Sequence, residues 1–173
     1  MLASDMLDRA CRSGATRHRN LRARGVAALR RGDPALAALL LNVSLIVSRA
    51  DGDTYGEAAS LAWMAAVEGR YDPKSAREHA LQAVALVRRE RMVDLAAFAF
   101  ALASIFDRSA GAARTSDPEI NVLALAASIH PNMCQSERLE RWTALNDAMA
   151  KLPASAAWTT PLLRLALKRA GME

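Results

Sequence analysis

The sequence predicts an all-α protein of about eight antiparallel helices, arranged as four stacked helical hairpins. Composition is the first observation: 52% of the 173 residues are apolar and only 5% are aromatic. Ala and Leu dominate, which favours helices that pack closely on small side chains. The second observation is a turn signal, Asp or Thr followed by Pro, found at residues 33–34, 72–73, 117–118 and 160–161. Each interval between these signals has room for two helices and two short loops.

The turn signal has a physical basis. An Asp or Thr side-chain oxygen accepts hydrogen bonds from the free amides of a helix's first turn. Proline suits the position after the cap, because its φ is already helical and it lacks the N–H that would otherwise be unpaired. Each of the four signals therefore predicts the start of a helix.

The N-terminal part of the chain is expected to hold an arm and the first hairpin. Residues 1–16 carry weak helical spacing and are expected to be a flexible or frayed arm, followed by one helical-repeat domain over residues 17–173. A first helix over residues 18–31 has an apolar stripe opposite a face of arginines. A second, over residues 34–49, is apolar almost all round, which predicts a helix covered on both sides by its neighbours.

The middle helices are expected at about residues 55–68, 73–91 and 93–107. Gly69 ends the first of them and a run of charges over residues 88–91 ends the second. The apolar face expected on the third consists of Leu95, Phe98, Leu102 and Phe106.

The last three helices are expected from residue 118 to before Pro131, from the cap Ser136 to Pro153, and from the cap Thr160 to about residue 169. The buried seam expected on the seventh helix consists of Leu139, Trp142, Leu145 and Met149.

Charge is unevenly distributed along the chain. The formal net charge is +5, and residues 1–31 hold eight arginines against two aspartates, so the remainder is close to neutral. This cluster supports one hypothesis, that the N-terminal region binds nucleic acid or another anionic surface. Residues 1–54 contain no aromatic side chain for base stacking, which favours a solvated arginine face or an arm that orders on an acidic partner.

The sequence offers no catalytic or metal-binding motif, so no enzyme activity, cofactor or metal is expected. It contains no Gly-rich phosphate loop, no His-Glu-x-x-His and no Gly-x-Ser-x-Gly. Cys11 and Cys134 form neither a metal-type pair nor a disulfide framework, which favours a cytoplasmic protein. No apolar run reaches the roughly 18–20 residues of a membrane span.

Residues 18–51 carry small side chains at a regular spacing. Gly25 and Gly32 lie seven residues apart, Ala37 follows five later, and Ser44 comes seven after that, with Leu45 next. This pattern resembles the small positions of a tetratricopeptide repeat, where two helices approach closely. Parts of the pattern recur at Ala62, Gly69, Ala76 and Ala83, at Ala126, Ala127 and Pro131, and at Trp142, Leu145 and Asn146. Generic helical hairpins with a related curve are the alternative.

The resemblance implies a right-handed superhelix in which the first helices of the hairpins line a concave groove. The groove residues that it assigns here are Arg19, Arg22, Arg30, Trp63, Phe100 and Asp147. Such a groove is basic at one end and apolar in the middle. It suits an extended or helical segment of a partner protein with acidic and apolar residues.

The function expected from the resemblance is a non-enzymatic adaptor or chaperone. In size and hairpin count the chain is similar to the cytoplasmic chaperones of bacterial type III secretion. The alternative is a helical protein that binds nucleic acid with its Arg-rich N-terminal region. A structural subunit that forms homo-oligomers through its hairpins is a third reading.

Overall fold

The computed structural model describes residues 17–106, 117–129 and 131–172, and over these ranges the chain is all-α without a strand. The first helix occupies residues 17–30. The later helices are α2 (Pro34–Ala50), α3 (Thr54–Glu68), α4 (Pro73–Glu90), α5 (Val93–Phe106), α6 (Pro118–Ala127), α7 (Gln135–Met149) and α8 (Thr160–Arg169). A 3₁₀-helix, η1 (Ala154–Thr159), leads directly into α8. The expected helices are thus confirmed in the described residues, whereas the expected arm, residues 1–16, lies outside them.

The three Asp-Pro signals act as predicted. A side-chain oxygen of Asp33 accepts from the Leu36 amide at 3.0 Å, and Asp72 accepts from Ser75 at 3.1 Å. One oxygen of Asp117 accepts from the amides of both Glu119 and Ile120, at 2.9 and 3.2 Å. In each case Pro occupies the first turn of the helix, as its fixed φ favours.

Two expected caps are wrong. Thr160 does not cap α8, because η1 runs straight into that helix, which makes Thr160 its first residue and puts Thr159 at the N-cap position. Ser136 does not cap α7, because Cys134 occupies the N-cap position and Ser136 lies in the first turn. Both errors arise where the chain enters the helix without the Asp-Pro turn that marks the other starts.

Small residues bring the first two helices together, as the repeat pattern predicts. A Cβ on Gly25 would lie 2.9 Å from Leu41 Cγ, so only glycine permits this approach. Ala37 and Ser44 of α2 are fully buried, and the Ser44 hydroxyl donates to the His18 carbonyl at 2.9 Å. Gly32 has a different role: its φ of +81° forms the left-handed turn after the first helix.

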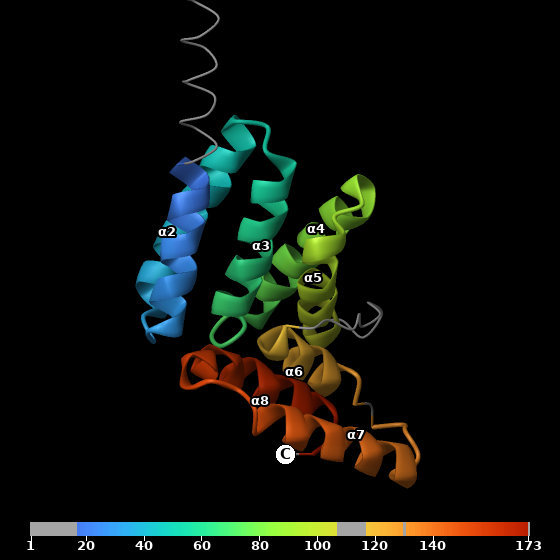
Figure 1. The fold of residues 1–173 in the computed structure, drawn as a ribbon. Coiled ribbons are helices and arrows are strands. Elements are labelled where there is room, and N and C mark those ends of the chain that lie inside the picture. The colour runs from blue at the N-terminus through green and yellow to red at the C-terminus, as the bar shows by residue number, and fades with distance from the viewer. Residues whose placement is uncertain (1–16, 107–116, 130, 173) are drawn as a thin grey trace, which may run out of the picture.

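Consecutive helices from α2 to α7 pack on one another, and α3 also contacts α5. The C-terminal part departs from this simple order. In Figure 1, α7 and α8 lie across the lower ends of the preceding helices rather than continuing beside them. α7 packs mainly on α6, while α8 contacts both α5 and α6. A tetratricopeptide-like superhelix therefore stays a prediction, while the all-α architecture of consecutively packed helices is confirmed.

The most completely buried helices are α3 and α5, where ten residues in each are buried. The expected face of α5 is confirmed, since Leu95, Phe98, Leu102 and Phe106 are all buried. The expectation for α2 is wrong: one of its faces is open, because its neighbours cover only the side that carries Ala37, Leu41, Ser44, Leu45 and Ser48.

The seam expected on α7 is wrong in part. Leu145 is buried and Trp142 is partly buried against the core, whereas Leu139 and Met149 are exposed. The seam is open because α7 lies at the edge of the molecule, with α6 as its main neighbour. No helix among the described residues is long and apolar enough to cross a membrane.

A buried carboxylate joins three distant segments. Glu119, in the first turn of α6, is only 6% exposed. Its Oε2 accepts from Arg30 Nη2 at 2.8 Å and from Trp158 Nε1 at 3.0 Å. The Trp158 ring in turn packs on Trp63 and Phe98, with ring centroids 5.1 and 6.3 Å apart. The first helix, the core helices and η1 are therefore held at one point, here called the Glu119 junction (Arg30, Glu119 and Trp158).

Removal of the Glu119 carboxylate should destabilise the fold. Glu119→Leu leaves the buried Trp158 N–H without an acceptor, so we expect a loss of about 1–3 kcal/mol in the free energy of unfolding. Glu119→Gln keeps an oxygen acceptor and should lose clearly less. Urea unfolding followed by circular dichroism measures both values, and equal stability of Glu119→Leu and the natural chain would contradict the role of the junction.

Candidate functional site

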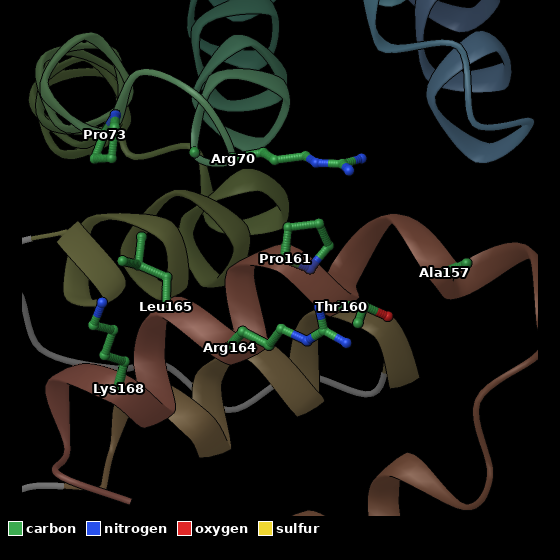
Figure 2. A pocket seen from close by; sticks show the side chains of 9 residues that line it. Arg70, Pro73, Ala157, Thr160, Pro161, Arg164, Leu165 and Lys168 are labelled. Carbon is green, nitrogen blue, oxygen red and sulfur yellow. The ribbon is translucent and has the colours of Figure 1, made fainter. Parts of the chain in front are cut away.

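An open cleft of about 590 Å³ lies where the α3–α4 turn meets α8. Its lining consists of Gly69, Arg70, Pro73, Ala157, Thr160, Pro161, Arg164, Leu165 and Lys168. Figure 2 shows Arg70 on one wall and Arg164, Leu165 and Lys168 on the facing helix. We call this surface the basic cleft.

The basic cleft concentrates positive charge. Arg70, Arg164 and Lys168 are all exposed, and the lining contains no carboxylate. None of the three has an ion-pair partner among the described residues. Between the charges lie apolar side chains, Pro73, Pro161 and Leu165. Unpaired guanidinium and ammonium groups beside an apolar wall are suited to an anionic ligand that also carries apolar groups.

A smaller recess of about 250 Å³ adjoins the basic cleft. The two share Arg70, Ala157 and Pro161, and the smaller one extends to Arg30 and Trp158 of the Glu119 junction. The Arg30 guanidinium is already bonded to Glu119, so its charge is largely compensated. The uncompensated positive charge therefore lies on Arg70, Arg164 and Lys168 rather than on Arg30.

Local packing positions the basic side chains. Gly69 ends α3 and is buried, and a Cβ at this position would lie 2.5 Å from Leu162 of α8 and 2.8 Å from Phe106 of α5. This close approach sets the α3–α4 turn, with Arg70, directly against α8. On α8 itself, Arg164 and Lys168 are four residues apart and hence share one face.

The structure brings two of the groove residues that the resemblance assigns close to each other. Arg30 and Trp63 come together, because Trp158 packs on the Trp63 ring and shares Glu119 with Arg30. Arg19 lies exposed on the first helix, and Asp147 lies exposed on α7.

Arg22 and Trp63 are both partly enclosed by the chain. Arg22 lies near Asp53 and Tyr55; burial lowers the pKa of its guanidinium, and the carboxylate of Asp53 acts in the opposite direction. The Trp63 ring is half-buried between Phe98, at 4.6 Å, and Trp158. Its packing is internal, so the role expected for it as a ligand anchor stays a prediction.

Phe98 and Phe100 point in different directions, as their spacing on one helix requires. Phe98 is buried in the core, whereas Phe100 is half-buried with the Arg88 guanidinium 4.9 Å above its ring. This geometry is a cation–π contact between α4 and α5. Phe100 therefore belongs to a different surface from the basic cleft.

The sequence reasoning missed the three residues that charge the cleft. Lys168 lies in the last turn of α8, where a cation also complements the helix dipole. The four-residue spacing of Arg164 and Lys168 is a visible signal of one basic helix face. The proximity of Arg70 has no local signal, since it depends on how the C-terminal helices cross the others.

The cleft offers binding groups rather than groups for proton transfer. Its lining contains no His, Cys, Asp or Glu, and Thr160 supplies its one side-chain hydroxyl. Within the described part of the chain, no group of three or more His, Cys, Asp and Glu residues is arranged to hold a metal ion. The arrangement is therefore suited to holding an anionic group in place.

Comparison with known proteins gives no match: no protein-family model, no curated protein and no solved structure matches this chain.

The unpaired charges of the cleft should reduce stability. Arg164 and Lys168 are like charges four residues apart, so Arg164→Gln should raise the free energy of unfolding by about 0.2–0.5 kcal/mol at low salt. The gain should disappear at about 0.5 M salt, where such charges are screened. Arg141→Gln on α7 is the matched control, because Arg141 follows Glu137 by four residues and its loss should slightly destabilise the chain. A loss of stability in Arg164→Gln at low salt would show that Arg164 is paired in solution.

Proposed function

We propose that this chain is a non-catalytic interaction module that binds an acidic, partly apolar segment of a partner protein in the basic cleft. The observation that carries the proposal is a set of three cations, Arg70, Arg164 and Lys168, which lie on the facing walls of one cleft and have no ion-pair partner in the part of the chain that the structure describes. A secretion-type chaperone is a narrower form of the same proposal.

The chemistry of the cleft supports an acidic segment. Arginine forms two parallel hydrogen bonds with a carboxylate, and lysine adds a mobile point charge. The apolar side chains of Pro73, Pro161 and Leu165 offer contacts to apolar groups between the acidic residues of a ligand. Electrostatic attraction would speed association, while the apolar contacts would slow dissociation.

A protein segment is favoured over nucleic acid by what lines the cleft. Nucleic-acid sites combine tracks of positive charge with aromatic platforms on which bases stack. The lining of the basic cleft contains no aromatic side chain, and its three charges are gathered in this one cleft rather than along a track. Nucleic-acid binding, expected as the alternative, is therefore one outcome of the test below.

The test uses a fluorescently labelled peptide of about twelve residues made of Asp, Glu and Leu, titrated with the full chain at about 0.15 M salt. Fluorescence anisotropy should show saturable binding. Arg70→Gln combined with Arg164→Gln should weaken it by about tenfold or more, since each charge-assisted contact contributes on the order of 1 kcal/mol. Arg141→Gln is the matched control and should leave the affinity unchanged.

A single-stranded DNA oligomer of the same charge forms the second arm. If the DNA binds more tightly than the peptide and its affinity falls steeply with salt, the nucleic-acid alternative replaces the proposal. Equal peptide affinity for the natural chain and the double variant would also overturn it.

A further inference from the structure

The open face of α2 carries a continuous apolar stripe. It consists of Leu36, Leu39, Val43 and Ile46, which are 38%, 62%, 38% and 60% exposed. We call these four residues the α2 stripe. Isolated exposed apolar residues are ordinary on a protein surface, but a contiguous line of four on one helix is a feature of interaction sites.

The spacing of the α2 stripe is specific. Its members are separated by three, four and three residues, which is the spacing at which the apolar side chains of two α-helices interlock along a seam. The opposite side of α2 is occupied by the first helix and α3, through buried residues such as Leu41 and Leu45. The stripe is thus a second packing face on a helix whose first face is already used.

We propose that the α2 stripe binds the α2 stripe of a second copy of this chain, which makes the protein a homodimer. This goes beyond the proposed function, because the stripe lies on α2 while the basic cleft is built from the α3–α4 turn and α8. A two-fold interface requires one surface that complements itself. The spacing of three, four and three residues is the same in both directions along the helix. The α2 stripe can therefore pair with an identical stripe in a parallel or an antiparallel arrangement.

Charge supports a second copy over a different partner. Helix pairs that select a foreign partner do so mainly through charges that flank the seam. From Pro34 to Ser48, α2 carries no charged residue, and Arg49 is bonded to Glu57 at 2.8 Å. Two copies therefore meet without like charges on the paired helices, and α2 has no charge by which it could select a partner of opposite sign.

The size of the α2 stripe determines how tightly two copies should bind each other. Four partly exposed side chains give much less than the roughly 800 Å² per partner of a standard stable interface. The dimer should therefore be weak, with a dissociation constant of about 10–100 µM. Association should depend on protein concentration and persist at high salt, because the contact is apolar.

Sedimentation equilibrium of the full chain from about 1 to 500 µM tests the inference. The apparent mass should rise from 18.6 kDa toward twice that value as concentration increases. Leu39→Lys should abolish the rise, because it puts like charges into the seam. Leu139→Lys on α7 is the matched control, since Leu139 is 64% exposed, and it should associate as the natural chain does.

Mixtures of variants test whether the two stripes face each other. Neither Leu39→Lys nor Leu39→Glu should associate alone. If the two α2 helices pair in parallel, a mixture of the two variants should restore the dimer, because the opposite charges then face each other. In an antiparallel pair, Leu39→Lys mixed with Val43→Glu restores it instead. A natural chain that stays at 18.6 kDa throughout would overturn the proposal, as would equal association of Leu39→Lys and Leu139→Lys. Circular dichroism of each variant confirms that the fold is retained.

Discussion

One carboxylate oxygen, Oε2 of Glu119, accepts hydrogen bonds from Arg30 near the start of the described chain and from Trp158 near its end. Such a group is costly to bury unless it is fully paired, and here both donors are supplied by the chain itself. Because the Trp158 ring also packs on Trp63 and Phe98, the polar contact and the aromatic cluster fix the same segment. The position of η1, and of the helix that follows it, depends on this junction.

That position determines the candidate site. α8 begins directly after η1, and its Leu162 packs against Gly69, so α8 lies beside the α3–α4 turn. The basic cleft exists only because these two segments meet. Its three cations have no ion-pair partner among the described residues, so their charges are free to meet a ligand. The packed interior and the charged cleft are thus parts of one arrangement.

Local signals made much of the fold predictable. Asp-Pro turns gave the starts of α2, α4 and α6 because the capping interaction involves residues three or fewer positions apart. The exposure of α2 was not predictable, since its apolar composition is that of a buried helix and only tertiary packing shows which face lacks a neighbour. The same holds for Leu139 and Met149, which sit on a helix at the edge of the molecule.

The candidate site was less predictable than the fold. Arg164 and Lys168 share a helix face by their spacing alone, but their meeting with Arg70 depends on contacts between residues far apart in the chain. Likewise, no local pattern marks Glu119 as the partner of Arg30. Both depend on contacts between helices far apart in the chain, which short-range periodicity does not encode.

The central claim is that the Glu119 junction builds the basic cleft by fixing η1 and α8. The most direct measurement is the affinity of the acidic peptide for Glu119→Leu, under conditions where circular dichroism shows that the variant is folded. Every basic residue of the cleft is retained in this variant. We predict that binding weakens about threefold or more, as expected when a connected packing element loses its anchor. Unchanged affinity would show that the cleft forms independently of the junction and would contradict the account.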